Sequence, residues 1–211
     1  MSVGAGAPGP QLDDPARAGA FITAVTTEHF ALQSAASTTV AEASSRASLY
    51  VLTLSSSLVA IGFAVNTDGF TPLIATVLPV IVALGIFTTV RLVDTGVQNL
   101  QLLSSIAHIR AYYRTLAVEG ASYFPARAED EADDAFASMA LKRRPTTALF
   151  TIASMVSLIN SVVAGAGVTL LVIEWASIAI ALVAGGAVAV VYTTGFYLYQ
   201  SYRYRRFHEG R

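Results

Sequence analysis

The 211-residue sequence contains no cysteine and few charged residues. Without cysteine the chain can form no disulfide, no thiolate metal site and no cysteine nucleophile. Only 13% of the residues are charged and 54% are apolar, whereas soluble domains carry about 25% charge. This composition, with a mean hydropathy of +0.58, excludes a soluble globular domain and a disordered chain.

Four long stretches of the chain hold no Asp, Glu, Lys or Arg: residues 47–67, 69–90, 145–173 and 175–202. A helix rises about 1.5 Å per residue, so about 20 residues cross a hydrocarbon core of about 30 Å. The sequence therefore predicts an all-α, polytopic membrane protein with four transmembrane helices in two hairpins, and it excludes an outer-membrane barrel. We place the spans at residues 47–66, 71–91, 147–171 and 176–200.

The basic residues predict the orientation of these spans. The two short connections, around Asp68 and around Glu174, hold no Lys or Arg, so all thirteen basic residues lie in 1–46, in 91–144 or in the tail. Because cytoplasmic flanks are rich in Lys and Arg, we predict a multi-pass protein of a bacterial inner membrane with both termini in the cytoplasm. The expected membrane-interface anchors are Arg46, Arg91, Arg143, Arg144, Arg203, Arg205 and Arg206. Tyrosines interleave with the tail arginines, which is typical of a span anchor; specific recognition of an anionic lipid is the alternative.

Two segments outside the spans have the apolar spacing of amphipathic helices. One runs from about Pro15 to Arg46, and the other follows the second span from Val93 to Ala107. Since both leave the membrane on the same side from adjoining spans, we expect an antiparallel pair that extends the first hairpin into the cytoplasm. The alternative is that the first stripe faces another subunit or the membrane surface. The expected units are a disordered leader (1–15), a cytoplasmic amphipathic helix (16–46), the first hairpin (47–91), a cytoplasmic helical loop (92–146), the second hairpin (147–200) and a basic tail (201–211).

No acidic, basic or histidine side chain lies between the ends of any span. Pumps, voltage sensors and ion-coupled transporters place such groups at membrane depth. The sequence also lacks the H-E-x-x-H, G-x-S-x-G and P-loop motifs, and His29, His108 and His208 have no partners at metal-ligand spacing. The net charge of −1 gives no attraction to nucleic acid. We therefore predict a protein that is not an enzyme and has no catalytic residue, cofactor or metal.

Small residues recur at every fourth position of the third and fourth spans. Such ridges let helix backbones approach closely in lipid, and they can specify either the packing of a hairpin or contacts between subunits. The predicted span-packing residues are Ser157, Ser161 and Gly165 in the third span and Ser177, Ala181, Gly185, Ala189 and Thr193 in the fourth. A shorter ridge in the first span comprises Ser56, Ala60 and Ala64.

Polar residues also occur inside the spans, namely Asn160 in the third and Ser55, Ser56 and Ser57 in the first. An amide or hydroxyl in hydrocarbon seeks a hydrogen-bond partner, so these residues are expected to join helices. The alternative is that they form the polar lining of a pore. Pro79 in the second span removes one backbone hydrogen bond and predicts a kink.

Several short stretches carry a resemblance. They are Glu28-His29-Phe30 with Gln33, Arg46-Ala47-Ser48-Leu49-Tyr50, Arg91, and Ile109-Arg110-Ala111-Tyr112-Tyr113-Arg114. The chain resembles uncharacterised multi-span membrane proteins of actinobacteria in these stretches. In layout, the first 115 residues are also similar to the SLATT-type effectors of bacterial conflict systems, although the second hairpin departs from that two-span pattern. The second resemblance implies an oligomeric membrane-disrupting effector that is activated by a partner.

Together these features favour a non-enzymatic inner-membrane protein that forms homo-oligomers through its spans and engages a cytoplasmic protein partner. The alternative is an oligomeric channel or a stress- or defence-triggered pore. A lipid-handling enzyme, or an accessory subunit of one, is a third hypothesis. The bilayer itself is the only partner that the composition requires.

Overall fold

The structure is a computed structural model that describes residues 15–116, 119–125, 137 and 151–209. These residues form helices and contain no strand, as the sequence predicts. The helices are α1 (Pro15–Ala64), α2 (Phe70–Thr115), the single turn α3 (Gly120–Tyr123), α5 (Ile152–Val172) and α6 (Ile178–Glu209). The predicted leader, most of the central segment, and Arg143 and Arg144 lie outside the described residues.

Four of these helices, α1, α2, α5 and α6, are long and apolar enough to cross a membrane. This confirms the predicted all-α architecture with four membrane-spanning helices. α1 and α2 form one hairpin through a short turn, and α5 and α6 form the other. Between α1 and α2, the backbone N–H of Thr67 donates to Ala64 O at 2.9 Å, and between α5 and α6 that of Trp175 donates to Val172 O at 3.0 Å. Thr151 caps the start of α5 by accepting a hydrogen bond from the Ser154 backbone N–H.

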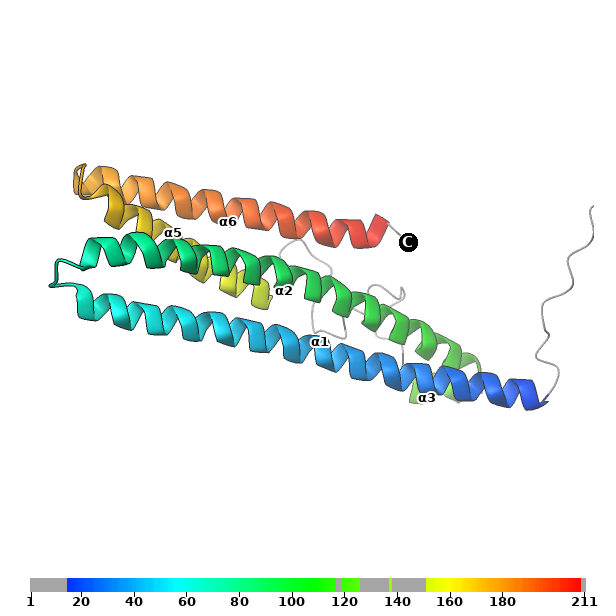
Figure 1. The fold of residues 1–211 in the computed structure, drawn as a ribbon. Helices are drawn as coiled ribbons and strands as arrows, with labels where there is room; N and C mark the ends of the chain where they lie inside the picture. The colour runs from blue at the N-terminus through cyan, green and yellow to red at the C-terminus, as the bar shows by residue number, and fades with distance from the viewer. Residues whose placement is uncertain (1–14, 117–118, 126–136, 138–150, 210–211) are drawn as a thin grey trace, which may run out of the picture.

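The two hairpins lie side by side with both turns at the same end (Figure 1). The inner helices α2 and α5 pack against each other, while α1 packs on α2 and α6 packs on α5. In their most apolar windows 28% and 39% of the α2 and α5 residues are buried, against 17% and 11% in α1 and α6. The two outer helices therefore present most of their apolar surface to the surroundings.

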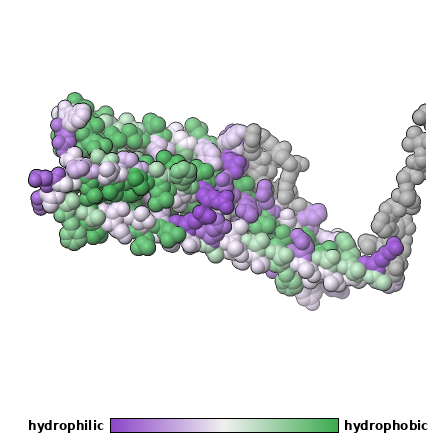
Figure 2. Space-filling view, viewed as in Figure 1, coloured by the Kyte–Doolittle hydropathy of each residue, from purple (hydrophilic) through white to green (hydrophobic). Residues whose placement is uncertain are grey.

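Figure 2 shows a broad apolar surface between the polar turns at one end and a polar band further along the molecule. Large apolar side chains of the spanning helices are exposed, among them Leu52, Phe63, Phe87 and Val183. The 21 residues of α5 rise about 32 Å, which matches a hydrocarbon core. An apolar surface of this extent is suited to acyl chains rather than to water.

The helices α1 and α2 continue well beyond the end of α6 (Figure 1). The 50 residues of α1 extend about 75 Å, more than twice the thickness of a hydrocarbon core. The segments predicted as separate units on either side of residue 46 form one uninterrupted helix, because no Gly or Pro occurs from residue 20 to residue 61. Likewise, α2 includes Pro79 and continues to Thr115 as one helix.

Beyond the apolar zone, α1 and α2 form the antiparallel pair expected from their apolar stripes. Ala36 and Thr39 of α1 are buried, as are Asn99 and Leu100 of α2. The Thr39 hydroxyl donates to Ala36 O of its own helix at 2.7 Å and also lies within hydrogen-bond distance of Asn99 Oδ1 of α2, at 3.2 Å. We call this part of the molecule the projecting hairpin, and we use the term for residues 15–45 and 92–116.

Candidate functional site

Asn160 of α5 lies at the point where all four spanning helices meet. Its side chain is fully buried. Asn160 Oδ1 accepts a hydrogen bond from the Tyr50 hydroxyl of α1 at 2.9 Å. Its Nδ2 donates to Val82 O of α2 at 3.1 Å and to the Tyr192 hydroxyl of α6 at 2.9 Å. We call these four residues the Asn160 junction.

Gly85 of α2 makes room for this amide. A Cβ atom placed on Gly85 would lie 2.3 Å from Asn160 Cγ and Oδ1, much closer than van der Waals contact. The junction therefore depends on a glycine in one helix, an amide in the next and two tyrosines from the outer helices. The polar groups of the junction hydrogen-bond to one another. If they lined a water-filled pore, they would be exposed to the lumen instead.

The other residues of the predicted polar lining lie elsewhere. Ser55 and Ser56 are exposed on α1 and Ser57 is half-buried. Each hydroxyl donates to the carbonyl four residues earlier in its own helix, at 2.8 to 2.9 Å. Such bonds satisfy a hydroxyl that faces lipid. Within one chain, the structure does not bring these serines and Asn160 to a shared surface.

The small-residue ridges of α5 and α6 face each other. Ser157, Ser161 and Gly165 are buried on α5, and Ala181 and Gly185 are buried on α6. A Cβ on Gly185 would lie 2.4 Å from Gly165 O and 2.0 Å from Thr169 Oγ1, so the two backbones are in direct contact. Farther along α6, Ala189 and Thr193 are half-buried, and Ser177 at the turn is exposed. The first-span ridge differs, because Ser56 and Ala60 are exposed.

A layer of polar side chains lies where the apolar surface ends. Gln200 of α6 is fully buried; its Nε2 donates to Thr151 Oγ1 at 3.1 Å, and its Oε1 accepts from the Ser154 hydroxyl at 3.2 Å. One turn beyond Gln200, Arg203 forms an ion pair with Asp94 of α2. This layer fastens the end of α6 to α2 and to the start of α5.

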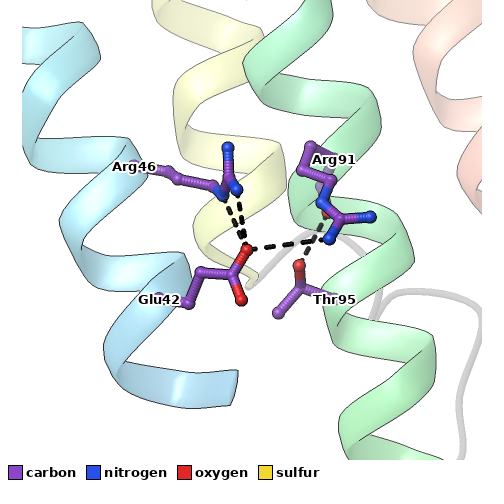
Figure 3. A network of polar contacts seen from close by, with 4 residues as sticks. All are labelled: Glu42, Arg46, Arg91 and Thr95. Atoms are coloured by element: carbon purple, nitrogen blue, oxygen red, sulfur yellow. Dashed lines mark hydrogen bonds and ion pairs between the residues drawn. The ribbon is translucent and has the colours of Figure 1, made fainter. Parts of the chain in front are cut away.

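On the α1 side of the same layer, Glu42 pairs with two arginines (Figure 3). Arg46 Nη2 lies 2.8 Å from Glu42 Oε1, and Arg91 Nη2 of α2 lies 3.8 Å from the same oxygen. We call these three residues the boundary cluster. Of the other predicted anchors, Arg205 is exposed, and the side chain of Arg206 lies outside the described ones.

The far end of the projecting hairpin carries aromatic side chains from three segments. Tyr113 of α2 packs against His29 of α1, with ring centroids 5.7 Å apart, and against Phe124 after α3, at 5.2 Å. Together with Phe30, Tyr123 and neighbouring side chains, they line an open pocket of about 560 Å³. We call it the tip pocket.

The imidazole of His29 is half-buried in the lining of this pocket. Its Nε2 accepts a hydrogen bond from Gln33 Nε2 at 2.8 Å. Burial lowers the pKa of the His29 imidazole, and the nearby positive charge of Arg110 lowers it further. The neutral ring is therefore favoured at the tip.

Sequence reasoning identified Asn160 but missed its partners. Tyr50 and Tyr192 are polar residues within charge-free stretches, and that is the signal that could have found them. Gln200 and the Asp94–Arg203 pair were missed for a different reason: nothing in the one-dimensional sequence indicates which turn of α2 adjoins which turn of α6. Within the described residues, no three His, Asp or Glu side chains gather as metal ligands.

Comparisons with known proteins give no relative. No protein-family model, no curated protein and no solved structure matches the chain. The resemblances to actinobacterial membrane proteins and to SLATT-type effectors therefore remain predictions from the sequence.

Proposed function

We propose that this chain is a non-enzymatic protein of a bacterial inner membrane that presents its projecting hairpin in the cytoplasm, where the tip engages a protein partner. The observation that carries the proposal is the continuity of α1 and α2 from the apolar zone to the tip pocket. A continuous, paired helix transmits a displacement of the tip to the spans, or of the spans to the tip. A flexible linker would not.

The exposed surface at the tip supports the choice of a protein partner. Phe30 is 65% exposed and lines the tip pocket together with the exposed Tyr123. Exposed aromatic residues around a pocket are typical of protein-binding surfaces. The orientation is supported by the arginines, because Arg46, Arg91 and Arg203 all lie at the tip-proximal end of the apolar zone.

Self-association is the second part of the proposal. The small-residue ridges of α5 and α6 are largely used within the chain, so they are not available to a second copy. The exposed Ser56 and Ala60 of α1, four residues apart, offer a close-approach surface in the apolar zone. We therefore assign self-association to α1.

Photo-crosslinking in cells tests the partner and the orientation together. A photoreactive residue at position 30 should yield a discrete adduct with a cytoplasmic protein at native expression level. The matched control is position 63, which carries another exposed phenylalanine of α1 at the opposite end of the apolar zone; it should yield none. A reporter that works only in the cytoplasm should be active when it is fused after Arg211, and a reporter that works only in the periplasm should be inactive there. A periplasmic signal, or an absence of protein adducts at position 30, would overturn the proposal.

Native mass spectrometry from lipid nanodiscs tests self-association. We expect the wild-type protein to give a species with more than one copy of the chain. The double substitution Ser56→Leu and Ala60→Leu should shift the distribution toward the monomer. The matched control is Gly186→Leu on the exposed face of α6, where an added Cβ has no neighbour within 4 Å. A wild-type protein that is monomeric in lipid would contradict this part alone.

The pore hypothesis has a direct test but gains no support from these contacts, because Asn160 is enclosed and the exposed serines are satisfied by their own helix. Dye release from liposomes that depends on Asn160 would restore it.

A further inference from the structure

The boundary cluster carries more positive than negative charge. Two guanidinium groups, from Arg46 and Arg91, converge on one oxygen of the Glu42 carboxylate (Figure 3). Arg46 Nε also donates to this oxygen at 2.9 Å. The cluster thus has a net charge of +1. Arg46 binds the Glu42 carboxylate closely, whereas Arg91 lies 3.8 Å from it.

Among the described residues, the Arg91 guanidinium pairs with Glu42, and this contact leaves it capacity for an anion. A guanidinium has five N–H donors in a planar fork, and 3.8 Å is an ion-pair distance rather than a hydrogen bond. The Arg91 side chain is 54% exposed and that of Arg46 is 44% exposed. Planar forks of this kind bind the oxygens of a phosphate in bidentate fashion.

The position of the cluster selects the kind of anion. Leu49 and Leu52, one and two turns from Arg46 along α1, are exposed and apolar, as are Phe87 and Val90 beside Arg91 on α2. The projecting hairpin begins on the other side of the cluster. The spare positive charge therefore lies at the depth of lipid headgroups, directly above side chains that acyl chains would cover.

Arg203, a described arginine of the same layer, provides an internal contrast. Arg203 of α6 pairs with Asp94 in a ratio of one to one, so that pair has no net charge. The boundary cluster therefore has an excess positive charge, whereas the Asp94–Arg203 pair does not. An anionic headgroup should therefore prefer the boundary cluster to the Asp94–Arg203 pair.

We propose that Arg46 and Arg91 bind the phosphate of an anionic phospholipid in the leaflet nearest the termini, with its acyl chains along Leu49, Leu52 and Phe87. Glu42 competes with the phosphate for both guanidinium groups and limits the affinity. The proposal depends on the position of the spans in a bilayer and not on the tip or its partner. A missing adduct at position 30 would therefore leave it unaffected.

The test counts lipids retained by the purified full-length protein in native mass spectrometry, with phosphatidylglycerol and phosphatidylcholine as probes. Arg91→Gln should lower the retention of phosphatidylglycerol by about fivefold, as expected for one arginine at an anionic surface, and should leave that of phosphatidylcholine unchanged. The matched control is Arg17→Gln, which removes an exposed arginine from the far end of the same helix. It should change neither.

Glu42→Gln provides a test in the opposite direction. Removing the competing carboxylate should raise the retention of phosphatidylglycerol, a gain that a misfolded variant could not produce. Equal losses in Arg91→Gln and Arg17→Gln would show general charge attraction and overturn the site. Displacement of the lipid by added inorganic phosphate would overturn the lipid assignment in favour of a soluble phosphate ligand.

Discussion

The spanning part of the molecule and the projecting hairpin are built from the same two long helices but packed in different ways. In the apolar zone, Gly165 and Gly185 bring two backbones into contact, and Asn160 joins four helices through its buried amide. In the projecting hairpin two helices pair along a narrow buried stripe, and Phe21 and Phe30 remain exposed.

The difference follows from the solvent on each side of the polar layer. In lipid there is no water to satisfy an unpaired polar group, so every amide in the apolar zone must find a partner within the protein. Outside the membrane, water satisfies polar groups at little cost, and two helices can pair with few specific contacts. We therefore expect substitutions in the spans to affect the whole molecule and those in the projecting hairpin to act locally.

The largest effect is expected from Gly185→Ala. The added methyl group would lie 2.4 Å from the backbone carbonyl of Gly165, so α5 and α6 must separate. Overpacking of this kind costs about 1–3 kcal/mol, occasionally more. The free energy of unfolding in bicelles should fall accordingly. Gly186→Ala is the control, since its new Cβ has no neighbour within 4 Å; an equal loss there would contradict the close contact.

A smaller but still global loss is expected from Asn160→Leu. The substitution removes three hydrogen bonds, each worth about 0.6 kcal/mol on average in a membrane, and deprives the Tyr50 hydroxyl of its acceptor. All four helices should loosen together in hydrogen exchange. Ser55→Ala should have almost no effect, because that hydroxyl bonds only to its own helix. Loosening confined to α5 would show that the junction does not couple the four helices.

How well a feature of this molecule can be predicted from the sequence depends on the kind of interaction that forms the feature. The four spans follow from charge-free length alone, because insertion depends on composition. The pairing of α1 with α2 beyond the membrane follows from two apolar stripes on helices leaving the same side. The helical continuity through Arg46 was also available, in the absence of Gly and Pro around it, but separate units were expected there.

The partners of Asn160 could not be predicted in the same way. Its bond to Tyr50 joins residues 110 positions apart, and it depends on how the two hairpins are rotated and offset. Those variables are set by shape, including the space that Gly85 leaves for the amide. The boundary cluster is intermediate: each arginine could be placed at the membrane surface, but their convergence on Glu42 could not.

Outside the spans, Thr39→Val should produce a weaker and local effect. It removes the hydroxyl that contacts Asn99 Oδ1 of α2 in addition to Ala36 O of its own helix while keeping the shape of the side chain, at a cost of about 1 kcal/mol. Hydrogen exchange should accelerate in the projecting hairpin near residues 36–42 and remain unchanged in α5. Thr38→Val is the control, because that exposed hydroxyl bonds to Ser34 O of its own helix. A change that extends into α5 would contradict the separation of the two regions.

The smallest effect is expected from the protonation of His29. Burial and Arg110 lower the pKa of His29 from the ordinary value of 6.5 when the tip is packed. When the contacts of the tip open, His29 regains the ordinary pKa, so between the lowered pKa and 6.5 the open form binds a proton more readily. The stability of the tip is thus fully present above 6.5 and decreases as the pH falls through that window. Protonation also occupies the Nε2 lone pair that accepts from Gln33. Hydrogen exchange around Tyr113, corrected for its intrinsic pH dependence, should show opening at low pH that His29→Gln abolishes. If the same opening persists in His29→Gln, another group governs the tip.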